Sequence, residues 1–485
     1  MMTTFTQVSD RKTQILVFAI LGMAMLVGAL MPAYVDLLGD HLAKLAALPA
    51  LLFFAFLVVY DRKLSLMMII VVRSAGDNLL ELTRFSLGGY QIGVGGLINA
   101  SVIVIALMLA LENPKTTPKY ITISWVVFLI LTFIGLILSP AKGDALRSWL
   151  ALVSYFAIFS SAVHFIQTEK DLRLCIKLIL LSSLVPALYS FADVALHHGV
   201  GGPEGFRLKS TFAHPNVFAF YLVLIIPLLF YFIKSMAPSN NDLPKFALFG
   251  YLILLAGLLL LTKTRSAWAV CLLTFLLYGA FFERRYLAYL FVMGVIALCI
   301  PAVRERFTDL ATGNQVVTYG RLNSFAWRLY IWKSALHWMK PVSYILGNGL
   351  QSFREFSKVF FPSAGQAEWG AHSVYVQLVF EIGAVGVAAF LTLFGSVLAE
   401  LKKIIRFDRL LAFFMVMVVV NFLISSLSDN MLDYLSFNWY FWFTIGVGCA
   451  YLKVAQLAVR SAPASSAASE TGPRQQSIGA AKRFK

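Results

Sequence analysis

The stretch AHSVYVQLVFEIGAVGVAAFL, residues 371–391, begins beside a histidine and continues as an apolar run that is long enough to cross a bilayer. Comparable runs recur along the whole chain of 485 residues, which is 59% hydrophobic and only 13% charged. A soluble chain carries about 25% charged residues. The sequence therefore predicts a polytopic membrane protein with an all-α fold, a bundle of transmembrane helices.

We expect about 12–14 spans, because roughly 20 apolar residues suffice for one crossing as a helix. The run 64–84 is the weakest of them, and no small-residue cleavage site follows the first run, so no cleavable signal peptide is expected. The expected spans are 13–35, 42–60, 64–84, 91–111, 119–139, 145–166, 172–195, 216–235, 245–262, 267–283, 285–303, 373–400, 409–429 and 436–457.

The positive charge of the chain indicates its orientation in the membrane. A formal charge of +16 suggests nucleic acid in a soluble protein, but cytoplasmic loops of membrane proteins also collect Lys and Arg. With the N-terminus inside, most Lys and Arg fall on the cytoplasmic side, loop after loop. We therefore expect a multi-pass membrane protein with both termini in the cytoplasm and no nucleic-acid partner.

The distribution of spans and loops divides the chain into five parts. Residues 304–372 form a large outer loop, in which apolar positions at helical spacing predict an amphipathic helix along the membrane face: Phe325, Leu329, Trp332, Leu336 and Met339. The other parts are N-terminal transmembrane helices at 1–195, central helices with short Arg-bearing outer loops at 196–303, C-terminal helices at 373–457, and a disordered cytoplasmic tail at 458–485.

The loop stretch RLKSTFAHPN, residues 207–216, is the first candidate site. Arg207 and Lys209 could anchor to lipid headgroups or cap helices, or they could bind an anion, since Arg offers a planar fork that matches phosphate. Pro215 suits the first turn of a helix, and His214 or Asn216 could hydrogen-bond a ligand or the helix end. A helix N-terminus beside an arginine favours phosphate.

Two further polar residues are expected on the same outer face. Arg265 lies in a very short turn and could simply reach the membrane surface, but with Arg207 it forms a plausible diphosphate clamp. His372 begins the span 373–400, where a histidine is often structural, yet it can take a proton near neutral pH. Because it closes the large outer loop, His372 can face the same cavity as Arg207 and Arg265.

Other charged residues favour structural roles. The stripe Arg73, Asp77, Glu81 and Arg84 has helical spacing and is typical of mutually paired charges facing a bundle interior. Asp429 and Asp433 could form a carboxylate pair on the substrate side or could be ordinary loop residues.

The sequence gives no support for nucleotide, metal or cofactor chemistry. No phosphate-binding Gly-rich loop, zinc-protease motif or Asp-x-Asp is present, which argues against ATP-driven transport and metal-dependent sugar-nucleotide chemistry. The four cysteines lie singly within apolar runs, so neither a disulfide nor a zinc site is expected. We expect no cofactor and no metal.

Three stretches resemble the O-antigen ligase/polymerase superfamily of bacterial inner-membrane glycosyltransferases. They are GFRLKSTFAHPNVFAFYL (205–222), WRLYIWKSALHWMKPVSYILGNGLQSF (327–353) and AHSVYVQLVFEIGAVGVAAFL (371–391). Relatives often carry Asn after the motif histidine, where this chain has Ser373. The matching motif residues are Arg328, Trp332, Gly347 and Gly349 in the second stretch and His372, Tyr375, Glu381 and Gly383 in the third.

The resemblance implies a GT-C-type enzyme whose donor is a glycan on undecaprenyl diphosphate at the periplasmic face. His372 matches the histidine thought to activate the acceptor hydroxyl, and Arg207 and Arg265 match arginines thought to bind the diphosphate. The reaction would be inverting and independent of metal. We expect Lys209 to join the diphosphate site. Further substrate-binding candidates are Asn216, His214 and Arg328.

The acceptor remains open between two alternatives in the family. A ligase transfers the glycan to lipid A–core, and a polymerase transfers it to a second lipid-linked glycan in O-antigen or exopolysaccharide synthesis; a relative acts on protein. The alternative from another class is a transporter or flippase of lipid-linked glycans. A transporter is expected to have related halves with interrupted helices near the midplane. The polar residues here gather toward one face, which favours an enzyme.

Overall fold

The structure is a computed structural model of the whole chain. It describes residues 60–82, 85–87, 90–92, 94–113, 116–196, 199–200, 205–236, 243–301, 303–304, 324–361 and 367–461. The expected spans 13–35 and 42–60 lie outside the described residues, apart from Tyr60, as does the predicted tail beyond Ser461.

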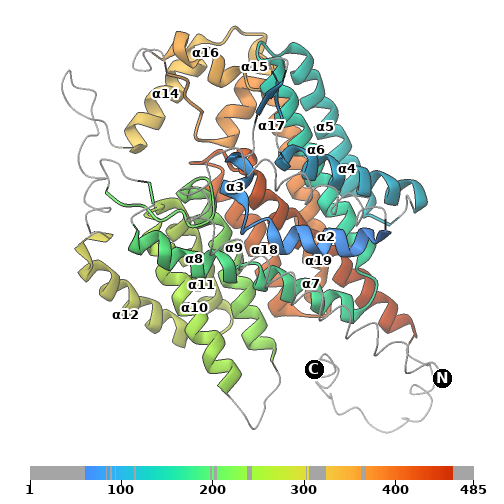
Figure 1. Ribbon diagram of the computed structural model, residues 1–485, viewed down its shortest axis with the longest axis vertical. Coiled ribbons are helices and arrows are strands. Elements are labelled where there is room, and N and C mark those ends of the chain that lie inside the picture. Colours follow the sequence, from blue (N-terminus) through green and yellow to red (C-terminus); the bar gives the residue numbers. More distant parts are fainter. Residues whose placement is uncertain are drawn as a thin grey trace, which may run out of the picture.

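The described chain is a bundle of helices with one small hairpin of strands (Figure 1). Eight of its helical segments are long and apolar enough to cross a membrane, and three shorter apolar helices accompany them. The prediction of an all-α polytopic bundle is therefore confirmed, and the protein is a multi-pass membrane protein. The eight are Gly95–Glu112, Lys119–Leu138, Lys142–Phe165, Glu169–Ala195, Pro215–Ser235, Leu243–Leu261, Val374–Arg406 and Leu435–Val459.

The N-terminal half of the described chain wraps one side of the bundle. In its core, Trp125 of α5 packs edge-on to Trp442 of α19 (Leu435–Ser461), with ring centroids 4.6 Å apart. Its elements are α2 (Arg62–Val72), α3 (Asp77–Leu82), β1 (Phe85–Leu87), β2 (Tyr90–Ile92), α4 (Val94–Glu112), α5 (Lys119–Leu138), α6 (Lys142–Phe165), α7 (Glu169–Leu181) and α8 (Leu184–Ala195).

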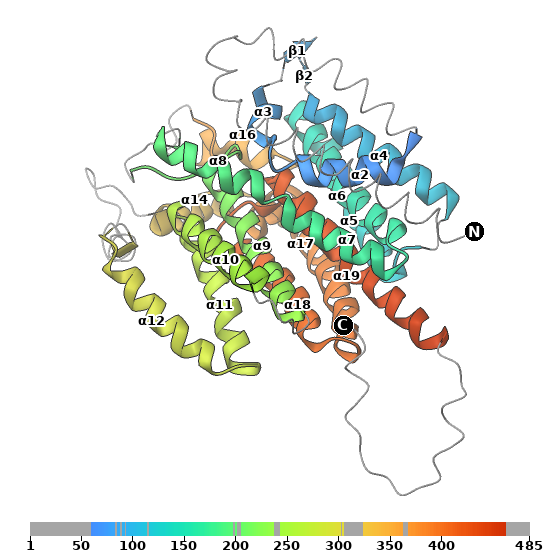
Figure 2. The same ribbon diagram turned by 60° about the horizontal axis from the view of Figure 1, so that its bottom comes forward.

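The second half contains the central helix of the bundle. Almost every residue of α9 is buried, which suits its apolar character on all sides. By contrast, α12 has no buried residue and extends away from the bundle (Figure 2). The elements are α9 (Pro215–Ser235), α10 (Leu243–Leu261), α11 (Arg265–Phe281), α12 (Arg285–Cys299), α14 (Ser324–Trp338), α15 (Ser343–Leu346), α16 (Ser352–Phe360), α17 (Val374–Leu401), η3 (Lys402–Arg406), α18 (Arg409–Ser425), η4 (Met431–Asp433) and α19 (Leu435–Ser461).

The prediction of one continuous helix over 64–84 is wrong. Helix α2 ends at Val72, and a turn separates it from α3. The turn is fixed by tertiary contacts, because Ser74 N donates to Tyr440 Oη at 2.9 Å and Arg73 pairs with Asp77 at 3.0 Å. This buried ion pair agrees with a structural role for the charged stripe. The side chains of its other members, Glu81 and Arg84, lie outside the described part of the structure.

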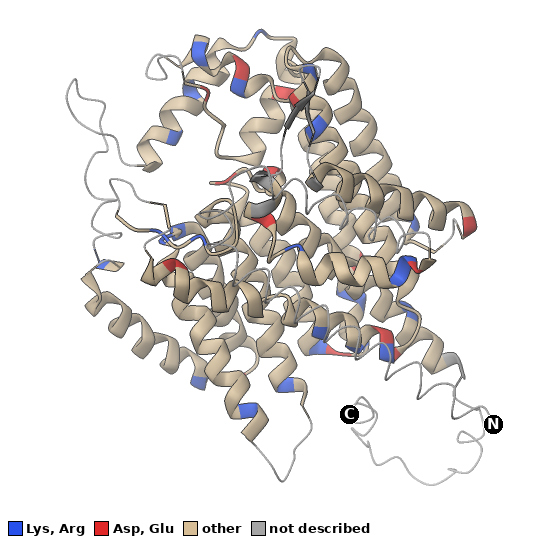
Figure 3. Ribbon diagram, in the orientation of Figure 1, with Lys and Arg blue, Asp and Glu red and all other residues tan. Residues whose placement is uncertain are grey.

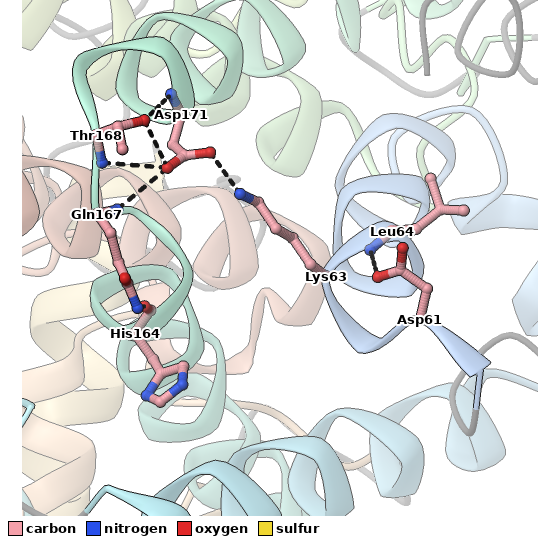
Figure 4. Close-up of polar contacts among 7 residues, drawn as sticks. All are labelled: Asp61, Lys63, Leu64, His164, Gln167, Thr168 and Asp171. Carbon is pink, nitrogen blue, oxygen red and sulfur yellow. Dashed lines mark hydrogen bonds and ion pairs between the residues drawn. The ribbon is translucent and has the colours of Figure 1, made fainter. Parts of the chain in front are cut away.

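Charged residues gather at helix ends and in connecting segments, leaving long uncharged helix interiors (Figure 3). At one end, which we call the Lys63 end, Lys63 contacts Asp171, which also accepts hydrogen bonds from Thr168 in a capping box; His164 lies beside this group (Figure 4). Lys234 also pairs with Glu283 at 2.6 Å where α9 meets the linker before α12. The helices α9, α11, α17 and α19 all begin at the opposite end, which we call the His372 end.

The described residues 324–361 and 367–373, which we call the outer segment, pack on the His372 end through a small core of their own. The predicted amphipathic helix is present as α14, with Ile331 and Ala335 fully buried. Phe325 and Leu329 of the expected apolar stripe are exposed instead, because the buried face is rotated away from them. Aromatic side chains from three elements complete this core: Trp338, Phe353, Phe360 and Phe380.

Helix α17 is interrupted at Gly383, which has φ 70° and ψ −175°. The interruption leaves the carbonyls of Phe380 and Glu381 available to another segment. Asn348 N donates to Phe380 O and Gly349 N to Glu381 O, each at 2.9 Å. The outer segment is thus joined to α17 by backbone hydrogen bonds.

We predict that Gly383→Ala lowers the thermal unfolding midpoint by several degrees, while Gly395→Ala leaves it within about one degree. A Cβ at Gly383 would meet Ile345 O at 1.9 Å, whereas nothing lies within 4 Å of that position at Gly395. The backbone at Gly383 also costs other residues about 1–3 kcal/mol. Thermal melts of the two purified variants in detergent test this, and equal midpoints would contradict it.

Candidate functional site

Arg207 is held by the turn between α10 and α11. Its Nε donates to Thr262 O at 3.0 Å, and its Nη2 donates to Thr264 Oγ1 at 3.1 Å and to Asn216 Oδ1 at 2.7 Å. Its backbone pairs with that of Val200. The guanidinium is therefore fixed between two loops and the first turn of α9.

Asn216 connects Arg207 to a buried carboxylate. While its Oδ1 accepts from Arg207, its Nδ2 donates to Asp429 Oδ1 at 2.8 Å. Asp429 also accepts from Tyr434 Oη and Ser266 Oγ, both at 3.0 Å. Burial raises the pKa of Asp429, so these hydrogen bonds compensate the desolvated carboxylate. Asp429 is thus a buried network residue and not an ordinary loop residue.

The loop 207–214 is held by two more carboxylates. Asp193, which is 1% exposed, accepts from the backbone N–H groups of Ser210 at 2.9 Å and Lys209 at 3.3 Å. Asp77 accepts from Ala213 N at 3.2 Å. Within the described residues, the Lys209 side chain makes no hydrogen bond or ion pair, so only its backbone is tied to this assembly. Sequence reasoning missed Asp193, which lies in an apolar run.

Arg265 begins α11 directly after the turn that holds Arg207. Its Nη2 donates to Ser324 Oγ at 2.9 Å, at the first residue of α14. Arg207 contacts Thr262 and Thr264 of this turn, and Arg265 is the residue that follows it, so both arginines lie at the same turn. The contact also links the outer segment to the start of α11.

His372 lies just before α17 in a left-handed conformation, with φ 49°. Such backbone is uncommon for residues other than glycine. Trp332 Nε1 donates to Ala371 O at 2.6 Å, and the Trp327 ring packs edge-on against the imidazole at 5.6 Å. Trp332 of the second motif therefore fixes the backbone that precedes His372.

The imidazole of His372 is neutral at neutral pH. Burial is the main reason that its pKa falls from 6.5 to about 4, and the positive charge of Arg328 adds to the effect, followed by His214 and Arg354. Desolvation and then the charge of Arg207 likewise lower the pKa of His214, although part of its side chain is exposed. His214 caps α9, with Nδ1 accepting from Asn216 N at 3.1 Å.

Ser373 does not orient the imidazole in this structure. Its Oγ accepts from Val376 N as the N-cap of α17 and donates to Ser426 O at 3.3 Å. Its backbone N–H donates to Asn430 Oδ1 at 2.9 Å. An Asn is therefore present beside His372, but it comes from the segment before α19.

Arg354 is a residue near His372 that sequence reasoning missed, whereas Asp433 was considered there as one of a possible carboxylate pair. Arg354, on α16, lowers the pKa of His372 and is the main charge opposing the rise that burial produces in the pKa of Asp433. Asn430 and Gln377 also hydrogen-bond Asp433. The sequence shows that Asp433 supplies a carboxylate near the end of a span. No sequence pattern connects it to Arg354, which lies on another helix.

The structure brings most of the expected site residues together at the His372 end, with Arg328 close to both His372 and Asp429. No hydrogen bond or ion pair with a described residue holds the Arg328 guanidinium. In the described part of the chain, no three His, Cys, Asp or Glu residues are grouped as ligands for a metal ion. The cluster is thus rich in guanidinium and imidazole groups.

Comparison with known proteins identifies the central part of the chain. Residues 250–391, which extend from α10 into α17 and include Arg265, Arg328 and His372, match the family model described as O-antigen ligase. No curated protein matches the chain. The family match supports O-antigen ligase/polymerase-type function, with lipid-linked glycan and lipid A–core as the general class of partner. The match covers less than half of the chain, and it supports membership of the O-antigen ligase/polymerase superfamily.

Proposed function

We propose that the protein transfers a glycan from undecaprenyl diphosphate to an acceptor hydroxyl, with the reaction at the His372 end facing the periplasm. The observation that carries this proposal is a neutral, half-buried imidazole at His372 beside several guanidinium groups. A base needs its neutral form to take a proton, and a leaving diphosphate needs positive charge.

Arg207 and Arg265 would bind the diphosphate of the donor. Guanidinium groups match phosphate oxygens through paired hydrogen bonds, and their charge does not depend on pH. Arg207 is fixed by Thr262, Thr264 and Asn216, so little reorganisation is needed when charge develops on the leaving group. Arg328 lies close enough to His372 to contribute at the reacting centre. Lys209 would act through the general positive charge of the loop.

His372 would act as the general base. The acceptor oxygen attacks the anomeric carbon from the face opposite the diphosphate, and its proton passes to the imidazole. The bond between that carbon and the diphosphate oxygen breaks, and its electron pair leaves with undecaprenyl diphosphate. This step inverts the anomeric configuration and needs no metal, because the guanidinium groups offset the charge of the leaving group.

Asn216 would be a positioning residue. Its amide is oriented by Asp429, so that its Oδ1 faces Arg207 and cannot point elsewhere without breaking two hydrogen bonds. His214 caps the same helix, with Nδ1 accepting from the Asn216 backbone. Both residues support the geometry around Arg207.

The orientation follows from the charge of the loops. The Lys63 end carries the segments rich in Lys and Arg, which are retained in the cytoplasm. We therefore place both termini in the cytoplasm of the bacterial inner membrane and the His372 end in the periplasm. Undecaprenyl-diphosphate-linked donor and lipid A–core, or a second lipid-linked glycan, would meet there.

We expect His372→Ala and Arg265→Ala to lower transfer by about a hundredfold or more, because each removes a group that acts in the transition state. Purified protein is supplied with lipid-linked glycan and EDTA, with and without lipid A–core, and products are resolved by gel. Longer glycan from donor alone identifies a polymerase, and transfer that requires lipid A–core identifies a ligase.

Two variants serve as matched controls. Arg147→Ala removes an exposed arginine of α6 that pairs with Asp144, and His164→Ala removes a histidine of the Lys63 end. Both should retain wild-type transfer. Equal activity of the His372 and Arg265 variants would overturn the assigned roles, and a strict requirement for divalent metal would overturn the metal-free reaction.

The pH dependence should follow the low pKa of His372. Because the folded pKa is about 4, the base stays neutral down to that pH, and kcat/KM should fall only well below the usual 6.5. Arg328→Gln removes a positive charge that disfavours protonation, so the acidic limb should move to higher pH. Arg147→Gln should not move it. A wild-type limb at or above 6.5 would contradict this assignment.

A further inference from the structure

An apolar groove lies between α8, α10 and the residues that follow α12. It has a volume of about 560 Å³. Binding pockets for small molecules typically have about 300–1,000 Å³. Its walls are formed mainly by aliphatic and aromatic side chains, among them Phe191, Val194, Leu254, Leu258, Ile300 and Val303.

The groove is open along the side of the bundle. Phe191 is 55% exposed and Ile300 44% exposed, although both line it. Because α8 and α10 belong to segments that are long and apolar enough to cross a membrane, we expect the open side to face lipid. Gly257 contributes to the wall from α10, and nothing lies within 4 Å of the position of a Cβ there.

The groove ends at the turn that holds Arg207. Lys263 lines its mouth and adopts a left-handed conformation with φ 52°. The residues on either side of Lys263 are Thr262 and Thr264, which both accept hydrogen bonds from Arg207. Leu261, another lining residue, accepts from Leu208 N at 3.1 Å. An amphiphile in the groove would therefore place its polar end beside Arg207.

We propose that this groove binds the polyprenyl chain of the glycan donor, with Lys263 beside the phosphate that carries the chain. This inference rests on the proposed function. The donor combines a long apolar chain with a diphosphate. In the structure, the apolar groove leads to Lys263, and Arg207 and Arg265 lie at the same turn. Opposite charge at the mouth and apolar contact along the walls match the two parts of that molecule.

The two phosphates distinguish this occupant from an ordinary membrane phospholipid. A phospholipid could place its acyl chain in the groove and its single phosphate near Lys263. The arginines beyond the mouth would then have no phosphate to bind. A diphosphate reaches both Lys263 and the turn of Arg207 and Arg265, so the groove selects a prenyl diphosphate and sets the depth of its anomeric carbon.

Photolabelling tests this site directly. A polyprenyl diphosphate with a diazirine on its chain is added to the full-length protein in nanodiscs, and labelled peptides are mapped by mass spectrometry. We expect labels on residues of α8 and α10 and competition by unlabelled polyprenyl diphosphate. Labels elsewhere, or equal competition by phosphatidylglycerol, would overturn the proposal.

A matched pair of glycine variants tests the groove itself. Gly257→Phe fills the groove and should lower labelling by about tenfold, which corresponds to about 1.4 kcal/mol of binding free energy. Gly250→Phe adds the same side chain on α10 outside the groove lining, also into open space, and should label normally. Equal labelling of the two variants, with matching elution and melting profiles, would overturn the proposal.

Transfer assays separate this inference from the proposed function. Gly257→Phe should raise the KM for a full-length donor and leave transfer from a short-chain, water-soluble donor unchanged. Lys263→Gln should weaken competition by unlabelled polyprenyl diphosphate. Wild-type protein that is labelled as expected but transfers no glycan would overturn the proposed function and leave the groove assignment standing. Transfer from the full-length donor that Gly257→Phe does not affect would overturn the groove assignment alone.

Discussion

The backbone pairing between residues 348–349 and the carbonyls freed at Gly383 is the contact on which the site depends. It joins a polar outer segment to a membrane helix without side chains that must be buried in lipid. Gly347 permits this approach, since a Cβ there would meet Glu381 O at 2.2 Å, and Gly349 permits close contact with Ser139 at the end of α5. The motif with Gly347 and Gly349 and the motif with Glu381 and Gly383 therefore lie on opposite sides of one interface.

This interface determines where the outer segment can hold His372. Once α15 is joined to α17, α14 lies across the start of α17, and Trp332 donates to Ala371 O. The left-handed backbone of His372 persists because both of its sides are fixed, by Trp332 before it and by the cap at Ser373 after it. Strained backbone of this kind is retained where the surrounding structure determines it. The first turn of α17 is thus a rigid support for the imidazole.

Apolar length and loop charge were sufficient to predict the helical bundle, and the motifs to predict which end carries Arg207, Arg265 and His372. The break after Val72 could not be predicted, because it depends on contacts with Tyr440 and Ser182 far along the chain. Arg354 escaped detection for the same reason, since its proximity to His372 arises only after the outer segment docks. Local pattern predicts helices, whereas docking of distant segments completes the site.

The carboxylates of the His372 end organise the site from within. Asp193 and Asp77 accept hydrogen bonds from loop backbone N–H groups. Asp429 accepts from Asn216, Ser266 and Tyr434. These hydrogen bonds hold the loops in place. If Asp429 instead bound Arg207 directly, the guanidinium charge would be cancelled before a phosphate arrived. The Asn216 amide lies between the two charged groups. Asp429 orients this amide, and the amide oxygen in turn orients the Arg207 guanidinium. The loop is therefore rigid and the positive charge of Arg207 is not neutralised by a carboxylate. A departing diphosphate requires such a fixed positive charge.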